Sequence, residues 1–232
     1  CMLINILYGP FSGMYESWQQ IIFLVSISSI SLGTFAAIRQ NNIKRLLAYS
    51  SIAHMGFALI GLLSFPSIAG VQALLIYMII YLATTLGVFA IIISLEVKDG
   101  ESINEISDFS GISRKYPFAA FTIAMFMFSY TGIPPLGGFF AKYLIFKSAI
   151  ESELIFLSIF GLLLSVIGAF YYIRIVKLMY FDKPKILILK SSARGLHFTN
   201  IICSTFIIFF ILIISVAPIT EITNIASTAL TK

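Results

Sequence analysis

Lys142 is the residue whose type and position most strongly suggest chemistry, because it is a charge inside a long apolar run. Residues 118–150 exceed the about 20 residues that a helix needs to cross a bilayer. Lys142 lies about 12 Å of helix before residue 150, which is deep for a side chain that reaches the surface by snorkelling. Desolvation disfavours the charged form of a buried lysine, so this one could alternate between ammonium and amine. We expect a proton carrier, with a snorkelling lysine as the alternative.

The segment before Lys142 cannot form an ordinary helix. Pro134 and Pro135 remove two backbone donors, while Gly132 and Gly137 add conformational freedom. A discontinuous helix is therefore predicted here, and its freed backbone groups could hold water or face a polar partner. The simpler alternative is a proline kink.

A second candidate group follows a short basic loop. His54 would lie about two to three turns into the next helix, where a residue that changes charge near neutral pH could relay protons. A hydrogen-bonded packing histidine is an equally good interpretation. Tyr49 and Lys44 are weaker candidates, and Lys44 can equally be a basic residue that fixes the orientation of the helix in the membrane.

Composition predicts how these residues are held. Hydrophobic residues form 59% of the chain and charged residues 11%, and the mean hydropathy is +1.00, as expected of an all-α membrane protein. About six transmembrane helices are predicted, the fourth of them broken. They cover residues 21–38, 43–64, 71–95, 118–150, 154–181 and 198–217.

Smaller features refine this layout. Small residues in 21–38 favour close helix packing. Trp18, in a predicted turn, and the Tyr171–Tyr172 pair are interpreted as membrane-interface anchors. Residues 102–105 fit a helix capping box, with Ser102 as the cap and Glu105 three residues later.

Polar residues of the third helix have two interpretations. They could line a water wire, but hydrogen bonding between helices is favoured. These residues are Tyr77, Tyr81, Thr84 and Thr85.

Charge placement predicts the orientation. Twelve of the fifteen Lys and Arg residues fall at the loops of one side, whereas only Lys147 and Lys232 fall on the other. The positive-inside rule then puts both termini on the outer side. Cysteine and histidine spacing gives no redox, metal or nucleotide motif, so we expect no cofactor in this chain, and we expect no nucleic-acid partner.

Three motifs resemble the antiporter-like subunits of respiratory complex I. They are residues 44–56 (KRLLAYSSIAHMG), residues 131–142 (TGIPPLGGFFAK) and residues 171–174 (YYIR). Within that family the motifs are most similar to those of subunit 2 of NADH:ubiquinone oxidoreductase. The resemblance implies that residues 21–181 form the second five-helix repeat, with Lys142 on its discontinuous helix.

The resemblance also assigns the remaining segments. Residues 1–20 would be the tail of a preceding helix and an outer-side turn, residues 182–197 a basic matrix-side loop, and residues 198–232 the last helix and its tail. The family's first repeat has no counterpart here. The resemblance therefore implies a split subunit, the C-terminal part of subunit 2, whose N-terminal half is a separate chain. A truncated sequence or a deletion of the first repeat is the alternative.

The function implied by the resemblance is proton translocation coupled to quinone reduction elsewhere in complex I. Expected partners are other membrane-arm subunits, the N-terminal-half chain and lipids. The expected location is the mitochondrial inner membrane, or alternatively a bacterial plasma membrane. The alternative functions are a subunit of a multi-subunit cation/proton antiporter, or a structural half-domain that does not pump.

Overall fold

The chain is a bundle of long helices that cross a membrane. A computed structural model describes residues 2–97, 103–184, 187–189, 198–207 and 223. Four stretches are long and apolar enough to span a bilayer: Ser12–Ile38, Ile43–Leu63, Ile68–Ser94 and Ile155–Phe181. The helices are α1 (Met2–Tyr8), α2 (Tyr15–Ile38), α3 (Ile43–Leu63), α4 (Ile68–Ser94), α5 (Ile112–Lys115), α6 (Pro117–Thr131), α7 (Gly137–Glu151) and α8 (Ile155–Phe181), with 3-10 turns η1 (Ser12–Met14) and η2 (Ile106–Phe109).

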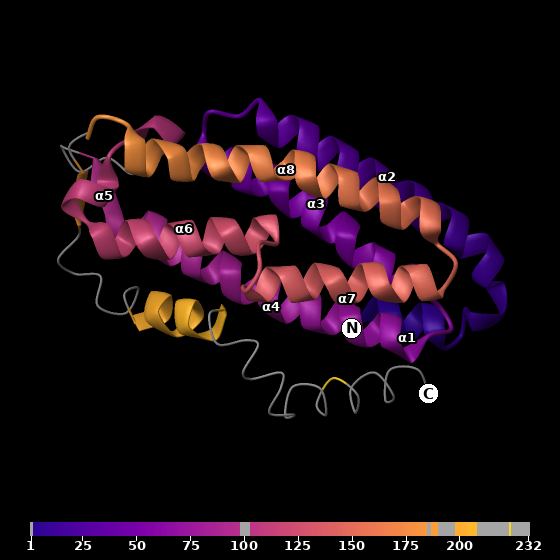
Figure 1. The fold of residues 1–232 in the computed structure, drawn as a ribbon. Coiled ribbons are helices and arrows are strands. Elements are labelled where there is room, and N and C mark those ends of the chain that lie inside the picture. The colour runs from indigo at the N-terminus through magenta and orange to yellow at the C-terminus, as the bar shows by residue number, and fades with distance from the viewer. Residues whose placement is uncertain (1, 98–102, 185–186, 190–197, 208–222, 224–232) are drawn as a thin grey trace.

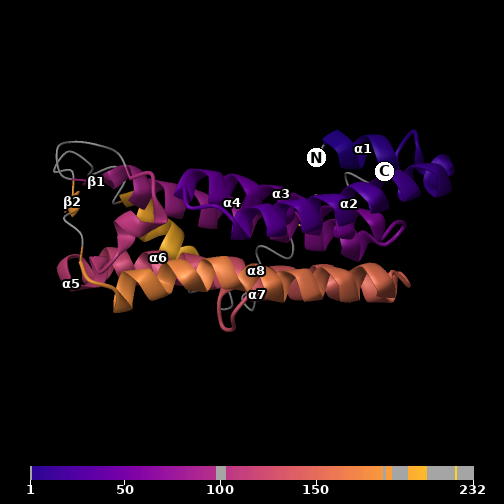
Figure 2. The same cartoon turned by 90° about the horizontal axis from the view of Figure 1, so that it is seen from above.

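The helices form two layers. Figure 2 shows α2, α3 and α4 together on one side and α6, α7 and α8 on the other. In Figure 1, α6 and α7 follow one another in nearly the same direction, with α8 running alongside both. The predicted broken helix is confirmed, because two helices of 15 residues each replace one continuous span.

Glycines allow α2 and α3 to pack at close range. A Cβ atom on Gly33 would lie 2.5 Å from the backbone nitrogen of Ala53, and one on Gly56 would lie 2.6 Å from Ile30 Cγ1. In a membrane, helices associate through such close contact of small residues. The expected role of small residues in the first helix is therefore confirmed.

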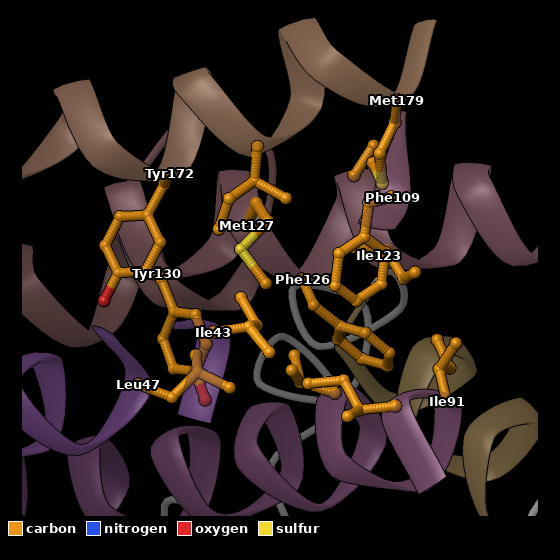
Figure 3. Close-up of a cluster of buried hydrophobic side chains, with 14 of the residues drawn as sticks. Ile43, Leu47, Ile91, Phe109, Ile123, Phe126, Met127, Tyr130, Tyr172 and Met179 are labelled. Carbon is orange, nitrogen blue, oxygen red and sulfur yellow. The ribbon is translucent and has the colours of Figure 1, made fainter. Parts of the chain in front are cut away.

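One apolar cluster fills the half of the bundle near the basic loops. Figure 3 shows Tyr172 and Met179 of α8 pointing toward residues of α6, with α3 and α4 below. Phe126 of α6 rests on Gly87 of α4, where a Cβ atom would lie 2.1 Å from the ring. The cluster fixes α6 against α3, α4 and α8, and thus fixes the end of α6 at which the span breaks.

The loops at this end are more ordered than the sequence suggests. Strand β1 (Leu95–Val97) pairs antiparallel with β2 (Leu187–Leu189), and Asn42 forms an isolated bridge with Glu105. The capping box is placed wrongly in the sequence interpretation, because Glu105 is itself the N-cap and exchanges hydrogen bonds with Asp108. Ser102 lies outside the described residues.

Two predicted interface anchors are in fact buried. Helix α2 begins at Tyr15, so Trp18 lies within it, and its Nε1–H donates to the carbonyl of Phe11 at 3.0 Å. Tyr171 and Tyr172 are also buried, in the apolar cluster. Aromatic residues near a helix end look alike in sequence whether they face lipid headgroups or the bundle, which is why these predictions were wrong.

The last predicted helix is described in part. Residues Phe198–Ile207 form an apolar helix. Its residue Asn200 donates to Thr122 of α6 at 3.4 Å, so this segment packs against the second layer. The predicted continuation over residues 208–217 lies outside the described residues.

Candidate functional site

The break between α6 and α7 is built by glycine and proline acting together. Gly132 ends α6 with φ of 88°, a left-handed conformation that favours glycine, and its N–H donates to the carbonyls of Phe128 and Ser129. Pro134 and Pro135 follow and are exposed. Helix α7 then begins at Gly137, and the N–H of Gly138 donates to Ser129 Oγ at 3.2 Å. The two half-helices are thus held together directly across the break.

Lys142 points back from α7 to the end of α6. Its Nζ donates to the carbonyl oxygen of Tyr130 at 2.9 Å, to that of Thr131 at 3.0 Å, and to Ser165 Oγ of α8 at 2.7 Å. Helical side chains lean toward the N-terminus of their helix, so a lysine in the second turn of α7 reaches the break. The side chain is 9% exposed, which excludes the snorkelling alternative.

These contacts match a charged lysine. An ammonium group has three N–H donors and no acceptor, and three oxygens receive them here. Two of those oxygens belong to the last turn of α6, where the helix dipole favours a cation. The face of the Phe57 ring lies 5.4 Å from Nζ and adds a cation–π contact. No described carboxylate pairs with Lys142, so neutral dipoles hold this charge.

His54 lies between two tyrosines from different helices. Its Nδ1 is 2.6 Å from the hydroxyl of Tyr77 on α4, and its Nε2 is 3.0 Å from the hydroxyl of Tyr172 on α8. A tyrosine hydroxyl can donate or accept, so either neutral tautomer of the imidazole is satisfied. The ring of Tyr130, whose carbonyl binds Lys142, has its centroid 5.1 Å from that of His54.

The predicted hydrogen bonds between helices are present. Tyr77 reaches His54, the hydroxyl of Tyr81 donates to Ser51 of α3 at 2.7 Å, and Thr85 bonds with the hydroxyl of Tyr130 at 2.9 Å. Thr84 instead donates to the carbonyl of Ile80 in its own helix. The polar groups of α4 therefore join three helices around His54.

Two small cavities touch both His54 and Lys142. One is also lined by Tyr77 and Ser129, and the other by Ser165 and Tyr172, and each has a volume of about 10 Å³. That volume is close to the minimum for one water molecule, and polar groups are present to bind it. A third and much larger cavity of about 690 Å³ lies on the other side of Lys142, between α7 and α8.

The four residues predicted to carry or relay protons do not all lie together in the structure. It brings Lys142 and His54 together, but Lys44 is exposed at the end with the basic loops and donates to Asn104 at 3.0 Å. Tyr49 packs against the edge of the apolar cluster and lines neither small cavity. This placement favours the interpretation of Lys44 as a basic residue that fixes the orientation of the helix in the membrane, rather than one that transfers protons.

Sequence reasoning missed three members of the site. Ser165 and Phe57 contact Lys142 directly, and Tyr172 binds His54. Phe57 offers a signal in retrospect, since it lies one helical turn after His54. Ser165 offers none, because many serines in this chain lie in helices and only packing selects the one that meets Lys142.

A comparison with known families decides the relationship of the chain. Residues 1–168 match a family described as NADH:quinone oxidoreductase/Mrp antiporter, TM. The chain belongs to this family. Among its relatives, NADH-quinone oxidoreductase subunit N 1 of Rhizobium meliloti (strain 1021) is 50% identical over 184 residues, which cover 79% of this chain and 38% of the relative.

Solved structures agree with the family. A chain of respiratory complex I from Thermus thermophilus with bound aureothin has a TM-score of 0.71 and 27% identity, over 81% of this chain and 42% of that one. A chain of the Mrp complex from Dietzia sp. DQ12-45-1b has a TM-score of 0.82 over 100% of this chain and 50% of that one. Its 17% identity supports likeness of fold alone. The predicted antiporter-like membrane fold is thereby confirmed.

These relatives also correct and limit the expectations. The sequence relative is named subunit N, so the expected similarity to subunit 2 is corrected to a similarity to subunit N. The three proteins come from bacteria and give no support to a mitochondrial membrane. The chain spans less than two fifths of the length of that relative. The separate chain for an N-terminal half stays a prediction, as do the expected domain boundaries and lipid partners.

Proposed function

We propose that this chain is part of a proton-translocating membrane subunit of an NADH–quinone oxidoreductase, of the subunit N type. Lys142 would be the proton carrier and His54 the relay that supplies it. The similarity to subunit N supports the complex, and the site supports the chemistry.

The observation that carries the proposal is the hydrogen bonding of Lys142. A buried ammonium with three oxygen acceptors is stable enough to form, yet no opposite charge among the described residues holds its proton permanently. A nearby positive charge on another subunit would disfavour the ammonium and expel the proton. Distant redox chemistry could therefore drive proton release from Lys142 by changing the charge on that neighbouring subunit.

The proton would reach Lys142 from His54. One water in either small cavity would accept a proton from the imidazolium and pass another to the neutral amine, leaving a neutral imidazole and an ammonium. The imidazolium would be restored through Tyr172, whose hydroxyl would give its proton to Nε2 while its oxygen takes up another from water on the side of the basic loops, so that the phenol is unchanged. Only protons move in these steps, and no bond between heavier atoms forms or breaks.

The decisive experiment is Lys142→Met in the assembled complex, reconstituted in sealed proteoliposomes. Methionine keeps the length of the side chain but cannot carry a proton. We expect NADH-driven proton translocation and quinone reductase activity to fall together. Lys177→Met, at an exposed position of α8, is the matched control and should leave both rates unchanged.

A result in which Lys142→Met translocates protons and reduces quinone at normal rates would exclude the role of Lys142. The structural half-domain, which does not pump, would then be the better interpretation. Assembly is checked first by the amount of variant that copurifies with the other subunits.

The remaining assignments follow from the same proposal. Partners would be other membrane-arm subunits of the oxidoreductase, and redox cofactors would reside on those subunits and not on this chain. The bacterial relatives favour a plasma membrane as the location.

A subunit of a multi-subunit cation/proton antiporter is the second candidate. The family name includes the Mrp antiporter, and the Mrp complex shares the fold. Purification of the native complex distinguishes the two: quinone reductase subunits copurify under the first proposal and are absent under the second.

A further inference from the structure

The large cavity between α7 and α8 is a long groove, called here the α7–α8 groove. Thr131 and Gly132 line its inner end, Lys147 and Glu151 line its outer end, and its volume is about 690 Å³. Glu151 lies nine residues after Lys142, which is about 13 Å along the helix. One leaflet of a bilayer supplies half of the about 30 Å hydrocarbon core, or roughly 15 Å. The groove therefore covers about the depth of one leaflet.

The walls of the groove are largely apolar and open to the outside of the chain. Four of its aliphatic and aromatic side chains are more than half exposed: Tyr143, Ile150, Leu162 and Val166. The last two belong to α8, which is long and apolar enough to cross a bilayer. Exposed apolar surface of this kind marks an interaction site. At membrane depth, a hydrocarbon chain is the simplest group that fits it.

Two opposite charges lie at the outer end of the groove. Lys147 Nζ and Glu151 Oε1 are 3.8 Å apart, and their side chains are 54% and 55% exposed. That distance is too long for a hydrogen bond, so each group can still bind another charged partner. This end of α7 is opposite the end of the bundle that carries α5 and the basic loops (Figure 1).

The same pair borders a smaller cavity on the α4 side of α7. This cavity has a volume of about 220 Å³, and its lining includes Ala73, Ile76 and Leu144. The two charges therefore lie between two hollows with apolar walls. A lipid with one charged head and two hydrocarbon chains has the same arrangement of groups.

We propose that the α7–α8 groove binds a phospholipid of the leaflet away from the basic loops, and that Lys147 and Glu151 select phosphatidylethanolamine by its head. The head lies over the two charged side chains. One acyl chain fills the groove toward Gly132, and the other enters the smaller cavity.

The selectivity follows from the charges of the head. Its phosphate accepts hydrogen bonds from the Lys147 ammonium, and its primary ammonium donates to the Glu151 carboxylate. Two carbon atoms separate these groups in the lipid, and the two side chains are neighbours one helical turn apart. Phosphatidylcholine has no N–H to donate to Glu151. Phosphatidylglycerol has no positive charge, so its phosphate faces the Glu151 carboxylate without compensation.

Lipid binding in this groove does not depend on proton transfer by Lys142. Lys142→Met should keep the lipid preference, whatever happens to proton translocation. A chain that translocates protons without this preference, or has the preference without translocation, separates a failure of lipid binding from a failure of the proposed function.

Photolabelling of the assembled complex tests the proposal. The complex is reconstituted in phosphatidylcholine bilayers with a trace of a lipid that carries a diazirine in one acyl chain, and labelled peptides are mapped by mass spectrometry. Three probes with identical chains carry ethanolamine, choline or glycerol heads. We expect label on α7 and α8, with about two- to fivefold more from the ethanolamine probe, because half-exposed ion pairs contribute modestly.

Variants of the two charged residues assign the selectivity. Glu151→Gln removes the repulsion of a second negative charge, so the glycerol probe should label this variant as well as the ethanolamine probe does. Lys147→Gln removes the partner of the phosphate, so labelling by both probes should fall. Glu153→Gln is the matched control, since Glu153 is an exposed neighbour that lines neither cavity, and its labelling should match that of the unchanged chain.

Two outcomes would overturn the proposal. If α7 and α8 carry no label while other membrane helices of the complex do, protein covers the groove. If the three probes label α7 and α8 equally in the unchanged chain, the groove accepts acyl chains without recognising a head, and the role of Lys147 and Glu151 is wrong. The second comparison needs no variant, so it holds even where a substitution impairs assembly.

Discussion

Lys142 requires three oxygen acceptors when it is charged, and the chain supplies them from the end of α6 and from α8. His54 requires partners for two ring nitrogens, and Tyr77 and Tyr172 provide them. The hydrogen bonds of both side chains are made to neutral groups. Under the proposed function, a small movement of one hydroxyl would therefore be enough to change where a proton resides.

The variant His54→Gln distinguishes a proton-relay role of His54 from a packing role. Glutamine can still hydrogen-bond to the two tyrosine hydroxyls but cannot exchange a proton, so the variant should assemble normally. We expect NADH-driven proton translocation to slow by about 100-fold if the relay is required. The measurement is proton uptake by sealed proteoliposomes, normalised to the amount of assembled complex.

Full activity of His54→Gln would support the packing interpretation. His54→Phe is the companion variant, because it leaves two buried hydroxyls without their nitrogen partners and should lower thermal stability whichever interpretation holds.

At the scale of elements, the broken span is the feature that creates the site. Helix α6 must stop at Thr131 so that the carbonyls of its last turn remain free for Lys142. Gly138 must lack a side chain, because a Cβ atom there would lie 1.8 Å from the carbonyl oxygen of Ser129. Stopping and restarting the helix thus places a cation against a helix C-terminus inside the membrane.

Gly132→Ala tests this arrangement. Gly132 has φ of 88°, and an added Cβ atom would lie 3.1 Å from Lys142 Cδ. A left-handed conformation costs a residue with a side chain about 1–2 kcal/mol. We expect a lower melting temperature of the detergent-purified complex together with slower proton translocation, because Lys142 must shift.

Gly13→Ala is the control for that change. A Cβ atom at Gly13 meets nothing within 4 Å. If the two alanine variants melt at the same temperature and translocate protons at the same rate, the conformation of Gly132 does not support the site.

The sequence predicts elements better than it predicts their contacts. Apolar runs define most ends of the long helices to within three residues, but α2 begins at Tyr15, six residues before its predicted start. Pro134 and Pro135 locate the break. The burial of Trp18 and the choice of Ser165 depend on how helices pack, which hydropathy does not encode. The pairing of β1 with β2 joins segments about ninety residues apart, and no local pattern reveals it.

At the scale of the whole molecule, the described basic loops gather at one end of the bundle. Arg174 at this end donates to Asn41 at 3.0 Å, and Lys44 donates to Asn104, so basic residues also tie the loops together. Lys147 and Glu151 lie at the other end. The charge asymmetry predicted from the sequence thus becomes a polarity of the folded chain.

Thiol labelling tests how that polarity is placed in the membrane. Glu153→Cys lies just before the start of α8 and Lys183→Cys just after its end, in a background where Cys1 and Cys203 are replaced by serine. The positive-inside rule predicts that an impermeant reagent labels Lys183→Cys from the inner side of the membrane and Glu153→Cys from the outer side. Labelling of both from one side would contradict a membrane-spanning α8.

The three acceptors of Lys142 couple charge to shape. The ammonium on α7 holds the end of α6 and the middle of α8 at once, so it acts as a clasp between three helices. An amine has two N–H donors and a lone pair, so it can still donate to the carbonyls of Tyr130 and Thr131 while its lone pair accepts a hydrogen bond from the Ser165 hydroxyl. Under the proposed function, loss of the proton would therefore reverse the hydrogen bond to α8 and keep those to α6. The neutral and charged states of a single side chain would then differ in how firmly α7 is tied to α8.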